Sequence, residues 1–189
     1  MKIQESRLEG CFEITLEPHE DARGFFMRTY DKNVFAESGL ALDWVQENKS
    51  FSRYRGTVRG LHFQHPPHSE AKLIRVESGE AFIVWVDIRK GSPTFGKWDA
   101  ATLSAQNKKA VLIPRGFANG LCTLSDDCVL LYKMDNYYHP EAQGVIAWND
   151  PVLNIDWPMR KPAVLSDRDA NAESFSEFSN TFGGLAVSS

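Results

Sequence analysis

The chain of 189 residues contains only three cysteines, Cys11, Cys122 and Cys128, and no two of them form a CxxC pair. A small and odd number of cysteines excludes a dense disulfide framework and favours a reducing compartment. No apolar run approaches the length of a membrane span, and residues 1–5 lack the apolar region of a signal peptide. We therefore expect a soluble, cytoplasmic protein.

The chain also lacks an excess of positive charge, because its formal net charge is -4 and its pI is about 5.7. This balance excludes a general basic field for nucleic acid, so any anion must be held by a local cluster of Lys and Arg. Hydrophobic residues at 42% and aromatic residues at 12% exclude a disordered chain. The length fits a single domain of residues 1–189, with its core at about residues 10–160. Residues 161–189 are expected to form a covering segment followed by a loose tail.

Short strand-like runs dominate the sequence, and Gly, Pro, Asn and Asp separate them. Runs at a spacing of about 8–12 residues are typical of an antiparallel sandwich or barrel. One short helix is predicted at residues 32–38, with Gly39 placed to end it. The predicted strands are residues 11–16, 24–30, 44–51, 57–64, 71–77, 80–88, 97–103, 109–114, 128–133 and 145–148.

The predicted strand at residues 80–88 is apolar on both faces, so both faces should be covered. The interior of a sandwich would cover one face. A second sheet or a second subunit would cover the other face, so this doubly apolar strand favours a dimer.

Charged residues gather in two neighbouring predicted strands, at residues 59–64 and 72–75. With a period of two, Lys72 shares a face with Ile74 and Val76, while Leu73 and Arg75 lie on the other. A lysine beside branched apolar residues indicates the wall of a pocket. The alternative is a solvated edge strand with the apolar stems of Lys and Arg lying along it.

Two stretches approach the metal-binding signature of the cupin barrels, but both lack ligands. Gly56, His62 and Gly79 fit the first, with Gln64 where a second histidine would stand. The second is Pro114-Arg115-Gly116-Phe117-Ala118-Asn119, where Asn119 takes the place of the histidine. A transition metal needs several imidazole or carboxylate ligands that converge, so we expect no metal.

Further motifs occur along the chain in a fixed order. Together they resemble the dTDP-4-dehydrorhamnose 3,5-epimerase family of cupins, over about residues 21–169. The motifs are residues 21–24 (DARG), 46–50 (QENKS), 59–64 (RGLHFQ), 72–73 (KL), 86–89 (VDIR), 116–118 (GFA), 132–133 (YK), 136–138 (NYY), 148–150 (WND), 155–158 (IDWP) and 165–169 (LSDRD). The resemblance implies an all-β cupin jelly roll with a few short helices, without metal or cofactor, and usually a homodimer. It also implies inversion of C3 and C5 in a nucleoside-diphosphate 4-keto-6-deoxyhexose.

Such an inversion needs a base, a cation that holds the enolate oxygen, and an acid on the opposite face. By resemblance His62 is the base, since imidazole titrates near the working pH, and Asp169 pairs with its other nitrogen. Lys72 is the cation and Tyr132 the acid. Arg23 and Arg59 are expected to clamp the pyrophosphate, because guanidinium groups match phosphate oxygens. The complete set of expected substrate-binding residues is Arg23, Arg28, Gln46, Asn48, Arg59, Asn119, Tyr138, Gln143 and Arg168.

Four positions depart from what is usual in the family. Asn119 replaces a histidine, Arg28 and Gln143 replace glutamates, and His19 replaces a phenylalanine. Arginine cannot accept a hydrogen bond from the N–H of thymine, so a GDP- or CDP-linked sugar is an alternative substrate. Inversion of a single carbon is another.

Other functions fit the sequence less well. A ketoisomerase of the same fold should have a second pocket histidine, which Asn119 removes. A cupin that only binds sugar nucleotides would lack the base and acid, whereas His62, Tyr132 and Asp169 are all present. A purely structural jelly roll would not need Arg59 and Lys72 beside apolar strand residues.

Overall fold

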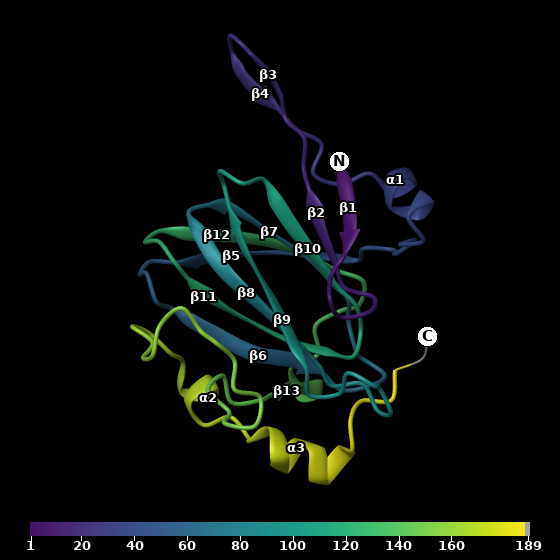
Figure 1. Ribbon diagram of the computed structural model, residues 1–189, viewed down its shortest axis with the longest axis vertical. Coiled ribbons are helices and arrows are strands. Elements are labelled where there is room, and N and C mark those ends of the chain that lie inside the picture. Colours follow the sequence, from purple (N-terminus) through teal and green to yellow (C-terminus); the bar gives the residue numbers. More distant parts are fainter. Residues whose placement is uncertain (188–189) are drawn as a thin grey trace.

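Two antiparallel sheets face each other in the computed structural model, which describes residues 1–187 (Figure 1). The six-stranded sheet has the order β1-β2-β10-β7-β12-β5, and the five-stranded sheet has the order β13-β6-β11-β8-β9. The prediction of an all-β, double-sheet jelly roll with a few short helices is therefore confirmed. The first sheet consists of β1 (Lys2–Glu5), β2 (Phe12–Thr15), β10 (Lys109–Ile113), β7 (Lys72–Ser78), β12 (Cys128–Met134) and β5 (Gln46–Ser52). The second consists of β13 (Gln143–Val145), β6 (Val58–Gln64), β11 (Phe117–Thr123), β8 (Glu80–Asp87) and β9 (Trp98–Ser104).

The space between the sheets is filled by apolar side chains from both. Ile74 and Val76 of β7 pack there with Ile83 and Trp85 of β8 and with Leu130 of β12. Their burial is the main source of stability for such a core. The predicted faces of the strand at residues 72–76 are confirmed, because Leu73 points to a different apolar cluster, beneath the N-terminal segments.

Strand β8 is covered on both faces, as its sequence predicts, but not by a second sheet or subunit on the outer face. Val84 and Val86 pack outward against a cluster that includes Phe175, Phe178 and Leu185. These residues belong to the C-terminal part of the chain, which runs along the sheet that contains β6 (Figure 1). The apolar outer face of β8 is thus no argument for a dimer.

Strand β11 was not among the predicted strands, although it pairs with both β6 and β8. Its Asn-Gly sequence is typical of turns, and the pairing partners supply the stability that local propensity does not. Gly60 of β6 allows β11 to approach closely, because a Cβ at Gly60 would lie 2.6 Å from the Cα of Gly120. The φ of Gly60, +124°, also favours glycine.

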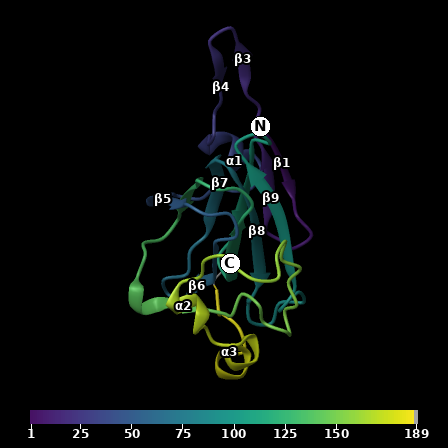
Figure 2. The ribbon, with the colours of Figure 1, turned by 90° about the vertical axis from the view of Figure 1, so that its left-hand side faces the viewer.

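A hairpin of β3 (His19–Asp21) and β4 (Gly24–Phe26) projects from the body as an arm (Figures 1 and 2). The sequence predicts a longer strand here, at residues 24–30, but pairing ends at Phe26, and Met27 and Tyr30 pack against an apolar cluster of the body. Phe25 and Phe26 are 56% and 68% exposed. Large apolar side chains that are exposed to solvent are typical of a surface that binds another molecule.

The predicted N-terminal helix is confirmed as α1 (Lys32–Glu37), which Asp31 caps by accepting from the backbone N–H groups of Asn33 and Val34. Two further short elements are η1 (Pro140–Ala142) and α2 (Asp167–Ala170). Within the described part of the chain, no helix is both long and apolar enough to span a membrane.

The C-terminal region contains a helix that the sequence analysis did not predict, α3 (Phe175–Phe182). Ser174 and Glu177 form a capping box at its start, and Phe175 and Phe178 are buried against the sheet. Residues 175–185 thus belong to the part of the C-terminal region that covers the sheet. The capping box, Ser174 followed by Glu177 three residues later, was a readable signal in a polar stretch.

Candidate active site

A cavity of about 330 Å³ lies between the two sheets and brings together most of the predicted site residues. Strands β6 and β7, from opposite sheets, contribute His62 and Lys72, and β12 contributes Tyr132. Its lining residues are Gln46, Asn48, Lys49, His62, Phe63, Gln64, Glu70, Lys72, Tyr132, Met134, Tyr138 and Gln143.

His62 and Asp169 form a hydrogen-bonded pair at this cavity. Nε2 of His62 lies 2.7 Å from Oδ1 of Asp169, which comes from α2, 107 residues further along the chain. The carboxylate is 4% exposed and the imidazole 29% exposed. Since Nε2 faces the carboxylate, Nδ1 is the ring nitrogen left for a bound molecule.

Asp169 is fixed by the start of α2 and by the backbone of β6. Ser166 caps this short helix and accepts from the backbone N–H of Asp169, and the N–H of Gly60 donates to Oδ2 at 3.3 Å. Burial alone would raise the pKa of Asp169, but the contact with His62 and these hydrogen bonds lower it below its ordinary value. The carboxylate therefore stays ionised beside the imidazole, and it can stabilise the imidazolium form.

Lys72 is held by two acceptors. Its Nζ donates to Oδ1 of Asn119 at 2.7 Å and lies 3.0 Å from Oε1 of Glu70. Glu70 was missing from the predicted site. Its position two residues before Lys72 could have revealed it, because residues two apart in an extended chain share a face.

Tyr132 lies on the opposite sheet from His62, so base and acid candidates approach the cavity from different sides. Burial raises the pKa of the Tyr132 phenol, and the neighbouring Asn48 amide and Arg59 charge offset part of this increase. A phenol with a raised pKa keeps its proton at neutral pH. It is thus available as a proton donor.

The positions that would hold a metal in the cupin signature serve other purposes here. Gln64 is buried, its Nε2 donates to Oε2 of Glu70 and to the carbonyl oxygen of Tyr137, and its Oε1 accepts from the N–H of His139. Asn119 accepts from Lys72. Over residues 1–187, no three His, Cys, Asp or Glu side chains converge in a way that could hold a metal ion.

The rim of the cavity gathers a second group of predicted residues. The hydroxyl of Tyr138 donates to Oε1 of Gln143 at 2.7 Å, and Nη1 of Arg168 donates to the same oxygen. Oε1 of Gln46 accepts from the backbone N–H of Tyr138, and Nε2 of Gln46 donates to Asn48. These contacts place an aromatic ring, a guanidinium and amides together.

Arg59 lies near this group but does not line the cavity. Its Nε donates to Oγ of Ser52 at 3.2 Å, and its Nη2 donates to the carbonyl oxygen of Phe51. These bonds hold an exposed guanidinium between β6 and the edge strand β5.

The structure does not bring Arg23 or Arg28 to the cavity. Arg23 lies on the β3–β4 arm, where it pairs with Asp21, and Arg28 pairs with Asp31 next to α1. His19 is on the same arm, opposite Phe26. Within one chain neither Arg23 nor Arg28 reaches the cavity, and their roles in substrate binding stay predictions.

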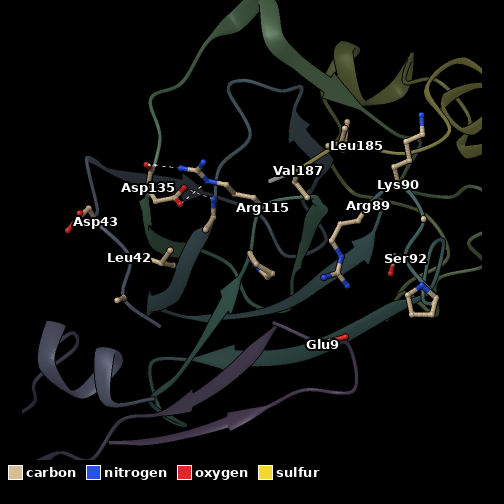
Figure 3. A pocket seen from close by; sticks show the side chains of 16 residues that line it. Glu9, Leu42, Asp43, Arg89, Lys90, Ser92, Arg115, Asp135, Leu185 and Val187 are labelled. Atoms are coloured by element: carbon tan, nitrogen blue, oxygen red, sulfur yellow. Dashed lines mark hydrogen bonds and ion pairs between the residues drawn. The ribbon is translucent and has the colours of Figure 1, made fainter. Parts of the chain in front are cut away.

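The larger hollow of the molecule, about 1010 Å³, contains none of the predicted site residues. Figure 3 shows Arg115 bonded to Asp135 there, at 3.0 Å, and Arg89 pairs with the buried Asp87 at 2.6 Å. Because both guanidinium groups are neutralised, this hollow has much less capacity to bind an anion than its arginines suggest.

The model of one protein family, described as dTDP-4-dehydrorhamnose 3,5-epimerase, matches residues 5–177. A protein of that name from Shigella flexneri is 47% identical over 156 residues, which are 82% of this chain and 85% of the relative. The chain belongs to the dTDP-4-dehydrorhamnose 3,5-epimerase family. This membership confirms the resemblance seen in the sequence motifs.

Solved structures agree with this assignment. A dTDP-6-deoxy-D-glucose-3,5-epimerase from Legionella pneumophila, in complex with dTDP-4-keto-L-rhamnose, superposes with a TM-score of 0.92. It is 37% identical, and the match covers 100% of this chain and 99% of that one. A 3′-monoepimerase from Streptomyces bikiniensis, in complex with dTDP-quinovose, gives a TM-score of 0.88 at 31% identity, over 96% of this chain and 91% of that one. The solved structures similar to this chain thus include enzymes named for two carbons and for one.

Proposed function

We propose that this protein is a cofactor-free epimerase that inverts C3 and C5 of a dTDP-linked 4-keto-6-deoxyhexose. The observation that carries the proposal is the 2.7 Å contact between His62 Nε2 and Asp169 Oδ1, in a cavity that also holds Lys72 and Tyr132. Family membership supplies the substrate class.

In the proposed reaction, Nδ1 of His62 takes the proton from the carbon beside the ketone. The electron pair of the broken C–H bond forms an enolate, whose oxygen is stabilised by the ammonium of Lys72. Asp169, ionised because of its lowered pKa, stabilises the imidazolium that results.

The phenol of Tyr132 then delivers a proton to the opposite face of the same carbon. The enolate electrons form the new C–H bond, the C4 ketone is restored, and the configuration is inverted without net oxidation. Solvent returns the proton to Tyr132 and removes the one on His62. Repetition at the second carbon completes the reaction.

The rim residues provide the nucleotide end of the proposed site. The ring of Tyr138 is 44% exposed and can stack on the base, while Arg59 and Arg168 offer guanidinium groups to the diphosphate. The hydrogen bonds among Tyr138, Gln143 and Gln46 hold this rim in shape.

We also propose that the protein is a homodimer. The arm leaves the body of its own chain and exposes Phe25 and Phe26 beside Arg23, which makes it suited to reach a second copy. In such a dimer Arg23 could act on a nucleotide, as the sequence predicts. A cytoplasmic location remains a prediction, which the three unpaired cysteine thiols support.

Inversion of C3 alone is the second candidate. Asn119, in place of the usual histidine, lies against the proposed enolate-stabilising Lys72. A change at this position can alter which enolate is stabilised, and a 3′-monoepimerase is among the structural relatives. A different nucleotide has less support, because Arg28 lies outside the cavity of its own chain.

The test is proton NMR of dTDP-4-keto-6-deoxyglucose with the enzyme in deuterated water, with the GDP- and CDP-linked sugars in parallel. Deuterium at both C3 and C5 supports the main proposal, and deuterium at one carbon supports the second. Absence of exchange with all three sugars would refute both. The same assay with Asp169→Asn tests the role of the carboxylate beside His62. Asp167→Asn is its matched control, because Asp167 is an exposed carboxylate on the same helix.

A further inference from the structure

Glu70 places a carboxylate in the proposed site that the reaction described above does not use. Its side chain is 4% exposed, and Oε1 lies 3.0 Å from the Nζ of Lys72, which is itself 12% exposed. A buried charge is costly unless it is paired and hydrogen-bonded. The Glu70–Lys72 ion pair is therefore a buried, structurally fixed part of the pocket wall.

The other oxygen of Glu70 is also occupied. Oε2 accepts from Nε2 of Gln64 at 3.0 Å, and Gln64 is itself bound to the carbonyl oxygens of His68 and Tyr137. These bonds prevent the carboxylate from rotating away from the lysine. Glu70 is thus held by Gln64, which lies on β6, the strand that also carries His62.

Asn119 holds the ammonium from a second direction. Its Oδ1 accepts from Lys72 at 2.7 Å, and its backbone lies opposite His62 in the β6–β11 pairing. An ammonium has three N–H donors. Among the residues that the structure describes, Glu70 and Asn119 accept from two directions, which leaves one donor for the cavity.

We propose that Glu70 is a positioning residue for the epimerisation: with Asn119 it fixes the Lys72 ammonium so that its third N–H faces the bound 4-keto sugar. The inference rests on the proposed function and deepens it. A flexible lysine would have to be ordered in each turnover, whereas this one is ordered before substrate binds.

The experiment measures kcat for epimerisation and the dissociation constant of dTDP in two variants. Glu70→Leu removes the acceptor, and we expect kcat to fall on the order of 100-fold, the scale seen when one preorganised electrostatic contact is lost. Glu70→Gln keeps an oxygen acceptor of similar size, and we expect its kcat to be at least about tenfold higher than that of Glu70→Leu. The affinity for dTDP should remain within about twofold of wild type, since dTDP lacks the 4-keto hexose that would meet Lys72.

Glu47→Leu is the matched control. Glu47 also pairs with a lysine, Lys133 at 3.3 Å, but its side chain is 49% exposed and does not line the cavity. This variant should keep the wild-type kcat. A similar loss in the control would overturn the proposal, because the effect would then belong to any lost lysine–glutamate pair.

Two results with the Glu70 variants would also overturn it: a wild-type kcat in Glu70→Leu, or equal losses of kcat and dTDP affinity in both variants. If Glu70→Leu does not fold, as circular dichroism would reveal, Asn119→Leu decides. A selective loss of kcat in Asn119→Leu supports the proposal and a wild-type kcat refutes it. An inactive wild-type enzyme would instead refute the proposed function, whereas an active enzyme with unaffected variants refutes this inference alone.

Discussion

The sugar end and the nucleotide end of the proposed site differ in how their side chains are held. At the sugar end, His62, Lys72 and Tyr132 stand on strands of the two sheets, and buried carboxylates from the same chain fix His62 and Lys72. At the nucleotide end, Tyr138 and Arg168 lie on loops and a short helix at an exposed rim. Buried contacts thus fix residues of the proposed chemical step, whereas exposed contacts hold those of the proposed nucleotide end.

His62→Ala should have the largest effect and tests the sugar end directly. A general base contributes about 10²- to 10⁴-fold, so kcat should fall by about 10³-fold, and deuterium exchange at both carbons should fall with it. NMR in deuterated water measures both. Exchange at the wild-type rate would assign the base to another group.

Tyr132→Phe should separate the two proton transfers. The phenol acts only when the enolate is reprotonated, so inversion should slow by about 10²-fold while exchange from the His62 side persists. The ratio of exchanged substrate to inverted product is the quantity to measure. If that ratio stays at its wild-type value, Tyr132 is not the acid.

Arg168→Met should act at the nucleotide end and so show the opposite pattern. Because Arg168 lies at the rim, beside Gln143, its loss should raise KM about tenfold and leave kcat nearly unchanged. Steady-state kinetics with the dTDP-sugar distinguish the two constants. A selective fall in kcat would contradict the division of the site into two ends.

The smallest of the expected effects is that of Asp169→Asn on stability, as distinct from activity, and its sign follows from the pKa of the carboxyl group. The pKa of Asp169 in the folded chain lies below its ordinary value of 3.8, so the ionised carboxylate stabilises the fold above that pH. This contribution is lost as the pH falls through the folded-state pKa. Urea unfolding should therefore show a loss of about 1 kcal/mol in the variant at pH 6–7, and a smaller loss near pH 3. An equal loss at both pH values would show that the carboxylate's charge is not what matters.

The same contrast explains how far the sequence could predict the molecule. The faces of β7 followed from its period of two, and the motifs at residues 59–64 and 165–169 placed His62 and Asp169 in one site, where the structure brings them into contact. The faces of such a strand are set by a local periodicity, which a sequence displays.

The failures lie where long-range packing decides. Strand β11 contains Asn119-Gly120, which is typical of a turn, and only its pairing with β6 and β8 makes it a strand. Likewise, the sequence predicted a covering segment at residues 161–189, but it did not show that Phe175 and Phe178 would cover β8 in place of a second subunit. The position of Arg23 depends on an arm that projects from the body of its own chain, and Arg28 pairs with Asp31 at the start of α1.

The most direct test of the central claim is a crystal structure with a dTDP-hexose that lacks the 4-ketone and so cannot react. The account predicts C3 or C5 of the sugar within about 4 Å of Nδ1 of His62, with Tyr132 on the opposite face of the ring. A sugar that lies outside the cavity between the sheets, or one that meets His62 and Tyr132 on the same face, would contradict it.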